Sequence, residues 1–243
     1  MQCVVSRYVL TLRAGAALTV FATVFATLFV ALFCLTNAAL AQDRRQNEAG
    51  QFDFYVLSLS WSPSYCEASA ERSPNQVSPD QQCGERRYSF VVHGLWPQYE
   101  KGFPEFCQVP APRLDRGIVS SMLDLMPSPR LIFHEWDRHG TCSGLSARAF
   151  FENVRKAHAV VKIPAEYLDL TAPLTVTPDQ VQDAFVKSNP GMTKASIAIS
   201  CDSKRLSEVR VCLSKDLQFR DCSEIGGRTC RRDTLVMPPS RGG

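Results

Sequence analysis

Two short segments of the chain concentrate residues that could perform acid–base chemistry. The chain has four histidines, and three of them, His93, His134 and His139, lie in the segments VVHGLWPQY and FHEWDRHGTC. With an unperturbed pKa of about 6.5, histidine can give and take protons near neutral pH. Two histidines that meet in one site could therefore act as a general acid and a general base.

The second segment places charged side chains on one face if it is helical. Glu135 lies three residues before Arg138 and four before His139, a spacing that puts all three on one face. His134 lies four residues before Arg138 and widens that face. A carboxylate, a fixed cation and two imidazoles suit an anionic reaction centre, because the cation can stabilise negative charge in the transition state.

A metal site and a cysteine nucleophile are the alternative interpretations of these residues. A zinc-protease helix needs H-E-x-x-H, whereas H-E-W-D-R-H places His134 and His139 about 140° apart on a helix. Cys142 follows His139 closely, but an even set of cysteines favours a disulfide. We therefore predict no metal ligands and no cofactor. For His158, within an amphipathic stretch, we expect an ordinary core position, and composition alone leaves a structural role open for His93 as well.

The first 41 residues have the layout of a secretory signal peptide. Arg7 and Arg13 precede an apolar run from Ala14 to Leu35, and an A-x-A cleavage site follows at residues 39–41. The apolar run is long enough to span a bilayer, so an uncleaved anchor is the alternative. The polar run after the A-x-A site favours cleavage. We predict a secreted or periplasmic protein with no stable membrane association after cleavage.

Cleavage would leave about 200 residues, enough for one domain with a substantial core. The formal net charge would fall from +3 to +1, because the leader holds two arginines and no acidic residue. Nucleic-acid-binding proteins often carry a strongly basic surface. Bulk charge therefore gives no support to a nucleic-acid partner, and any such interaction must depend on a local site.

Cysteine usage indicates an oxidising compartment. Cys3 and Cys34 belong to the leader, and an even number of cysteines remains in an exported chain, which is typical of a disulfide framework. The remaining eight are Cys66, Cys83, Cys107, Cys142, Cys201, Cys212, Cys222 and Cys230. No C-x-x-C pair occurs, which disfavours a zinc site.

Hydrophobic patterns predict an α+β domain with an antiparallel central sheet and peripheral helices. Strands are expected at 54–60, 88–92, 196–201, 208–213 and 217–221. Helices are expected at 114–126, after Ser128 through FHEWDRHG, at 146–161 and from 177 to about 189, with loops at 62–86 and 97–113. We divide the chain into a signal peptide at 1–41, a flexible lead-in at 42–52, a catalytic domain at 53–237 and a disordered tail at 238–243.

The two histidine segments resemble the active-site segments of the ribonuclease T(2) family. FVVHGLWPQY at 90–99 resembles the first and FHEWDRHGTC at 133–142 the second, in the same order. LSLSWSPSYC at 57–66 is similar to the family's first core strand, and the resemblance covers most of residues 52–231. It implies a ribonuclease T(2)-like fold and a metal-independent endoribonuclease that cleaves single-stranded RNA. Separately, we expect the protein to be a monomer.

The resemblance also implies roles for the catalytic residues. His93 would protonate the leaving 5′-oxygen, and His139 would remove the proton of the ribose 2′-hydroxyl. Glu135 and Arg138 would stabilise the pentacovalent phosphate. The product would be a 2′,3′-cyclic phosphate, opened slowly or not at all to a 3′-phosphate. DNA, which lacks the 2′-hydroxyl, would not be cleaved.

Substrate-binding residues follow from the same resemblance, with two departures from the family pattern. His134 would hold the phosphate, and Trp96 would pack at the substrate site. Position 138 is Arg where the family commonly has Lys, so we expect activity to persist with altered phosphate geometry. Gln98 and Tyr99 stand where many relatives have an acid for base recognition, so we expect broad base specificity.

The resemblance pairs three sets of cysteines and leaves the fourth by remainder. The implied disulfides are Cys107–Cys142, Cys201–Cys230, Cys212–Cys222 and Cys66–Cys83. A catalytically silent secreted module that binds RNA or a protein through the same cleft is the rival function. The intact set of proton-handling and charged residues disfavours it.

Overall fold

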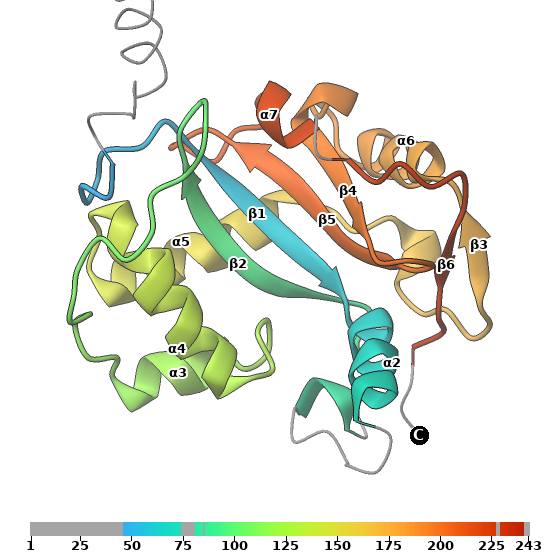
Figure 1. The fold of residues 1–243 in the computed structure, drawn as a ribbon, viewed down its shortest axis with the longest axis horizontal. Coiled ribbons are helices and arrows are strands. Elements are labelled where there is room, and N and C mark those ends of the chain that lie inside the picture. Colours follow the sequence, from blue (N-terminus) through green and yellow to red (C-terminus); the bar gives the residue numbers. More distant parts are fainter. Residues whose placement is uncertain (1–45, 74–80, 85, 227–228, 241–243) are drawn as a thin grey trace, which may run out of the picture. The chain divides into compact units, whose positions relative to one another are not determined.

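A computed structural model describes residues 46–73, 81–84, 86–226 and 229–240 (Figure 1). The chain separates into two compact units, and all described residues belong to the second, which begins at Arg45. The predicted signal peptide lies outside the described residues. Within the described part of the chain, no helix has the length and apolar character needed to cross a membrane.

A four-stranded antiparallel sheet with the order β2-β1-β5-β4 forms the centre of this unit (Figure 1). Its strands are β1 (Phe54–Trp61), β2 (Phe90–Gln98), β4 (Ile197–Cys201) and β5 (Leu206–Leu213). The predicted α+β class and antiparallel sheet are confirmed. The sequence patterns missed a small second sheet, in which β3 (Leu174–Val176) pairs with β6 (Leu235–Met237).

The two faces of β1 serve different purposes because successive side chains of a strand alternate. The odd-numbered residues from 55 to 61 pack in the main hydrophobic core. Phe54 and Val56 belong to a small second cluster on the other face. Ser58 and Ser60 continue this second face, which the functional side chains described below share.

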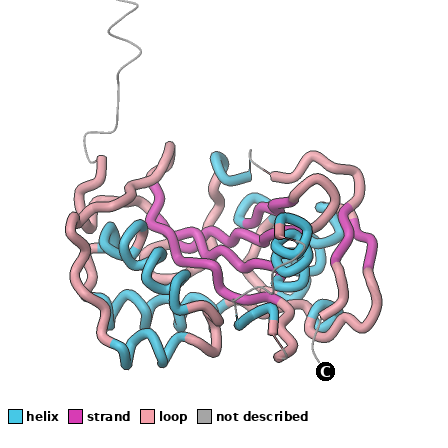
Figure 2. The backbone as a smooth tube through the Cα atoms, turned by 60° about the horizontal axis from the view of Figure 1, so that its bottom comes forward, coloured by secondary structure: helices cyan, strands magenta, loops and turns pink. Residues whose placement is uncertain are grey.

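Helices gather at both sides of the sheet. They are α2 (Ser62–Arg72), α3 (Arg116–Met122), α4 (Pro129–Arg138), α5 (Ala147–Val160), α6 (Pro178–Ser188) and the short α7 (Ser223–Gly226). Figure 1 shows α3, α4 and α5 together on the side of β2, and α6 on the side of β4. In Figure 2 the strands run between these helical regions.

Three of the four predicted helix starts are confirmed by side-chain caps, whereas the helix expected at 114–126 is shorter and spans only Arg116–Met122. Ser128 caps α4, with Pro129 in the first position, by accepting a hydrogen bond from the Leu131 amide (3.4 Å). Ser146 caps α5 in the same way. Thr177 begins α6 with a capping box that it shares with Gln180. The caps satisfy amides that would otherwise lack partners in the first turn.

Two segments have a different type of secondary structure from the one predicted. The segment expected to be a loop at 62–86 begins with α2, because Pro63 occupies the first turn, where its missing amide proton costs nothing. The strand expected at 217–221 is absent apart from a single bridge between Leu213 and Phe219. Leu217 has a φ of 60°, which extended backbone cannot accommodate.

The described parts of both ends form hydrogen bonds with the rest of the domain. The Asn47 amide donates to the Tyr99 hydroxyl (3.2 Å), and the Gly50 amide donates to the Cys142 carbonyl (2.9 Å). At the other end, the Trp61 indole donates to the Pro238 carbonyl (3.0 Å), and Ser240 is buried. Residues of the expected lead-in and tail thus contact the rest of the domain, and the flexibility of 42–52 and disorder of 238–243 stay predictions.

The outer strands of the central sheet are tied to neighbouring segments. On β2, the Val92 amide donates to the Leu125 carbonyl (2.9 Å), in the connection between α3 and α4. On β4, the Ile199 carbonyl accepts from the Cys230 amide (2.7 Å), and the Ile199 amide donates to the Thr229 hydroxyl (3.2 Å). Each edge therefore has partners from elsewhere in the chain.

Four disulfides join the pairs that the family resemblance implied. They are Cys66–Cys83, Cys107–Cys142, Cys201–Cys230 and Cys212–Cys222. In three of them, one cysteine lies in an α-helix or strand of the domain, namely Cys66 in α2, Cys201 in β4 and Cys212 in β5. Cys107–Cys142 ties the loop after β2 to the turn that follows α4, and this turn is part of the site described next.

Candidate active site

One cavity of about 270 Å³ brings together all six site residues predicted from the sequence. They are His93, Trp96, His134, Glu135, Arg138 and His139. Four further residues line the same cavity, namely Gln98, Phe103, Arg210 and Ile225. Phe103, Arg210 and Ile225 had no place in the sequence-based prediction.

A β-bulge positions His93. On β1, Ser58 lies opposite Gly94 and the next residue, Leu59, lies opposite Val92, so His93 is an extra residue in β2. Such a bulge turns a side chain out of the regular alternation and is often found next to active sites. The strand predicted to end before His93 in fact continues to Gln98, and the histidine lies at its irregular point.

Gly94 allows the strand to approach α4 closely. A Cβ atom at this position would overlap the Glu135 carboxylate and the indole nitrogen of Trp96. These two groups are hydrogen-bonded, with Trp96 Nε1 donating to Glu135 Oε2 at 2.7 Å. The glycine after His93 therefore makes room for the contact between β2 and α4.

The end of α4 supplies the other side of the site. Glu135 is buried on α4, and its backbone carbonyl accepts a hydrogen bond from the His139 amide (3.0 Å). The helix ends at Arg138, so His139 is its C-terminal cap and not a helical residue as predicted. His139 stays in the same turn and packs 5.5 Å from the Trp96 ring. His134 is exposed at the rim of the cavity.

His93 lies between two carboxylates. Its Nδ1 is 2.5 Å from Oε1 of Glu208 on β5, and its Nε2 is 3.6 Å from Oε1 of Glu135. Burial acts to lower the pKa of His93, but the hydrogen bond and charge of Glu208, together with the charge of Glu135, raise it above its ordinary value. His93 therefore favours the charged imidazolium form.

Glu135 and His139 are shifted toward their neutral forms. Burial raises the pKa of Glu135 to about 7, against the opposing influence of His93 and of the hydrogen bond from Trp96. Burial, followed by the charges of Arg138, His134 and His93, lowers the pKa of His139 to about 3. His139 Nδ1 is buried and has no hydrogen-bond partner among the described residues. His139 is thus a neutral imidazole over most of the pH range in which His93 is charged.

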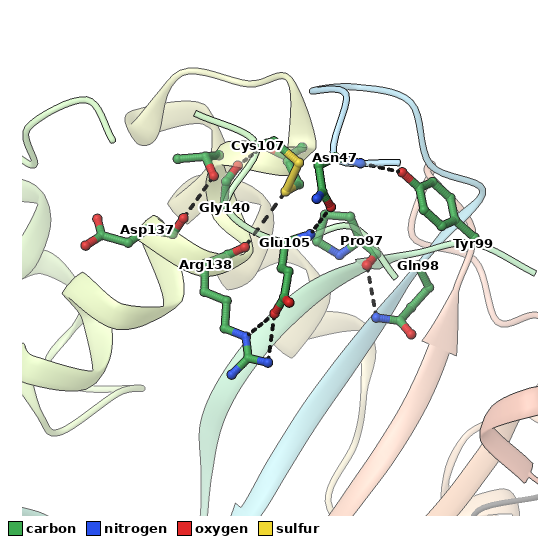
Figure 3. The surroundings of a disulfide bond; sticks show 12 residues. Asn47, Pro97, Gln98, Tyr99, Glu105, Cys107, Asp137, Arg138 and Gly140 are labelled. Atoms are coloured by element: carbon green, nitrogen blue, oxygen red, sulfur yellow. Dashed lines mark hydrogen bonds and ion pairs between the residues drawn. A yellow bond between two sulfur atoms is a disulfide. The ribbon is translucent and has the colours of Figure 1, made fainter. Parts of the chain in front are cut away.

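Arg138 is held by a loop that faces the cavity. Its Nε and Nη2 atoms each lie 2.9 Å from Oε2 of Glu105, and both partners are partly exposed (Figure 3). These contacts use one edge of the guanidinium, so the opposite edge can meet an anion. The Cys107–Cys142 disulfide holds the same loop against the end of α4 (Figure 3).

A second cavity of about 100 Å³ also reaches His93. Its other lining residues are Ser60, Tyr65, Gln82, Val91, Ser128 and Leu131. His93 is therefore common to two cavities of different size and lining. Within the described residues, no group of three or more His, Cys, Asp or Glu side chains has the arrangement to hold a metal ion.

A family model supports the resemblance found in the sequence. The model of the ribonuclease T2 family matches residues 52–222, which include all six site residues predicted from the sequence. The chain belongs to the ribonuclease T2 family. Within the family, the chain keeps both histidine segments and carries Arg at position 138.

Named ribonucleases are among the relatives of this family member. A "Probable ribonuclease" of Haemophilus influenzae is 30% identical over 185 residues, which are 73% of this chain and 63% of that protein. A "Ribonuclease" of Aeromonas hydrophila is 44% identical over 108 residues, or 44% of this chain and 45% of that protein. The chain thus spans less than two thirds of the length of either relative.

Solved structures with the ribonuclease T2 fold match most of the chain. "RNase NT in complex with 5′-AMP" is 26% identical, with a TM-score of 0.60, and the match covers 78% of this chain and 99% of that one. An "RNase-related protein from Calystegia sepium" has a TM-score of 0.62 at 20% identity, covering 78% and 98% of the two chains. The second likeness concerns the fold alone.

Proposed function

We propose that this protein is an endoribonuclease that cleaves single-stranded RNA by transesterification, without a metal ion. The observation that carries the proposal is the pair of histidines in one cavity with opposite protonation preferences. His93 favours the charged form and His139 the neutral form. A pair of titratable groups whose environments push their pKa values apart is what an acid and a base need.

The proposed reaction uses a nucleophile that belongs to the substrate. His139 accepts the proton of the ribose 2′-hydroxyl, and the 2′-oxygen forms a bond to phosphorus. The bond from phosphorus to the 5′-oxygen breaks, and His93 gives its Nε2 proton to that oxygen. The products are a 2′,3′-cyclic phosphate and a free 5′-hydroxyl. Arg138 and His134 stabilise the added negative charge on the phosphate, and Glu135, in the neutral form that its burial favours, can donate a hydrogen bond to a phosphate oxygen.

The two cavities that meet at His93 support cleavage within a chain of nucleotides. With the phosphate between His93 and His139, the larger cavity takes the nucleoside that carries the 2′-hydroxyl. Phe103 and Trp96 offer it rings, and stacking accepts any base. The smaller cavity takes the leaving nucleoside. Gln98 supports broad base specificity because its amide can both donate and accept hydrogen bonds.

Relatives and the leader segment support the remaining parts of the proposal. A related solved structure is titled as a complex with 5′-AMP, which is a nucleotide ligand. The signal-like residues 1–41 and four disulfides favour an exported protein, secreted or periplasmic, that folds in an oxidising compartment. We further propose that it acts as a monomer.

Cleavage of a defined oligoribonucleotide in EDTA, followed by mass spectrometry, tests the function. The wild type should give 2′,3′-cyclic phosphate ends, and a matched substrate with one 2′-deoxyribose should stay intact at that position. His93→Ala and His139→Ala should each lower kcat/KM by at least the ~100-fold typical of lost acid–base catalysis.

His158→Ala is the matched control, because His158 is half-buried on α5 and lines neither cavity. It should cleave at the wild-type rate. Intact RNA bound by the wild-type protein would instead support a catalytically silent RNA-binding module. Loss of cleavage on addition of EDTA would contradict the metal-independent reaction.

A further inference from the structure

An ion cluster on β5, formed by the buried Glu208 and the partly exposed Arg210, lies next to His93. Glu208 Oε1 is 2.5 Å from His93 Nδ1, and Glu208 Oε2 accepts hydrogen bonds from Arg210 at 2.9 Å (Nε) and 2.7 Å (Nη2). The Glu208 side chain is 11% exposed. The Arg210 guanidinium also packs over the Trp96 ring at 5.2 Å. The cluster therefore joins β5 to both functional residues of β2.

The topology of the sheet explains how His93 and Glu208 meet. β1 lies between β2 and β5, and Ser60 of β1 is the direct neighbour of Glu208. The small Ser60 side chain leaves space above β1, and its hydroxyl donates to Glu208 Oε1 (3.4 Å). The bulge at His93 supplies the change of direction on the other side. The contact thus spans three strands.

We propose that Glu208 is a positioning residue for His93, fixing its tautomer and holding it in the charged form that a general acid needs. The inference rests on the proposed function, in which His93 is that acid. Because Nδ1 is committed to Glu208, the other nitrogen, Nε2, must face the cavity and the substrate. Its separation from Glu135 Oε1, 3.6 Å, agrees with that orientation.

The charges around His93 favour this role. Glu208 and Arg210 face it from β5, Glu135 faces it from α4, and His139 lies beyond the end of that helix. Burial acts to raise the pKa of Glu208, but the hydrogen bond and charge of His93, with Arg210, lower it to about 2. Glu208 is therefore ionised wherever His93 titrates, and its negative charge stabilises the imidazolium.

Glu208→Gln separates charge from shape. Glutamine has nearly the same volume, and its amide oxygen can still accept a hydrogen bond from Nδ1. Only the negative charge is lost, so the pKa of His93 should fall. An opposite charge at this distance changes a pKa by roughly one to three pH units. In an NMR titration, the pKa of His93 in Glu208→Gln should therefore be lower than in the wild type by about one pH unit or more. The chain has only four histidines, so their signals can be told apart.

The kinetic profile gives the second measurement. The reaction needs a neutral His139 and a protonated His93. As the pH increases, kcat/KM should therefore rise when His139 loses its proton and fall when His93 loses its proton. In Glu208→Gln the falling limb should move to lower pH by the amount seen in the titration. The rising limb should stay in place, because Glu208 is not among the groups that shift His139. Glu208→Asp, which keeps the charge, should lie nearer the wild type.

Glu166→Gln is the matched control, since it removes the same charge from an exposed position that lines neither cavity. It should leave both the His93 titration and the pH profile unchanged. The inference is overturned if His93 titrates at the same pH in wild type and Glu208→Gln, with both proteins folded. A wild type that cleaves no RNA while the His93 titration still moves would reject the proposed function and leave Glu208 as the group that sets the charge of His93.

Discussion

At the scale of single residues, Arg138 shows what a planar cation can do that a point charge cannot. One edge of the guanidinium contacts Glu105, and the other edge can meet a phosphate oxygen. A lysine in this position would offer one nitrogen to both partners. The arginine therefore keeps its orientation without giving up its charge toward the substrate.

Substitution of Arg138 should separate charge from geometry. Arg138→Met should lower kcat/KM by about 10²–10³-fold, the usual effect of removing one group that stabilises transition-state charge. Arg138→Lys keeps the charge and should stay within about tenfold of the wild type. Steady-state cleavage of one oligonucleotide measures both, with Arg116→Met, on the exposed start of α3, as the control. Equal losses in the Met and Lys variants would show that charge at position 138 is not what matters.

The residues of the site were predictable to different degrees for a physical reason. Six lie in two short segments, where spacing alone predicts that they can meet. Glu208 lies 115 residues after His93, and only the pairing of β1 with both β2 and β5 brings the two together. Its one local sign is a charged residue at the start of a predicted strand, on the face opposite Val209 and Val211, and this alone does not identify a partner.

At the scale of elements, the loop after β2 depends on a covalent link. This loop carries Phe103 at the cavity and Glu105 on Arg138, and its far end is fastened by Cys107–Cys142. The disulfide thus holds substrate-facing groups against α4. We therefore expect the disulfide both to raise the free energy of unfolding and to maintain the shape of the site.

Removing this disulfide should affect both properties. In the chain-entropy account, a closed loop of this length is worth about 4 kcal/mol of unfolding free energy. Cys107→Ala with Cys142→Ala should therefore unfold at lower urea concentration and show a raised KM. Cys201→Ala with Cys230→Ala closes a loop of similar length and is the control. This control should lose a similar free energy of unfolding and keep the wild-type KM. An equal rise in KM for both double variants would contradict a local role of the Cys107–Cys142 disulfide at the site.

Elements with a full hydrophobic pattern or a cap were predictable, and short or irregular ones were not. The starts of α4, α5 and α6 follow from Ser128, Ser146 and Thr177. β3 and β6 have three residues each, too few for a period to appear. α2 was missed because its serines and charges resemble a loop until the proline is placed in the first turn. The bulge in β2 leaves no compositional trace.

At the scale of the whole molecule, the net charge is small. The formal net charge is +3 over 243 residues. Several arginines of the described residues lie in ion pairs, including Arg155 with Asp124 and Arg220 with Glu100. We therefore expect the local cations at the cavity, and not a strong net positive charge, to attract RNA.

This charge distribution predicts a weak dependence of RNA cleavage on salt. For single strands, each neutralised phosphate contributes a slope of about −0.7 in log affinity against log salt. With one or two phosphate contacts, log(kcat/KM) should fall with a slope of roughly −1 in NaCl. Arg138→Met should reduce the magnitude of that slope by about 0.7. A slope several times steeper in the wild type would mean that cations outside the cavity bind the RNA.

The ties at the two outer strands have a consequence for the behaviour of the protein at high concentration. An open strand edge offers its amides and carbonyls to another chain and can start aggregation. Here Val92 of β2 is bonded to Leu125, and Ile199 of β4 is bonded to Thr229 and Cys230. The Val92 amide and both backbone groups of Ile199 are thus already bonded and are not available to a second molecule. The contact that ties β2 to the connection between α3 and α4 therefore also reduces the number of edge groups at which the sheet could grow by strand addition.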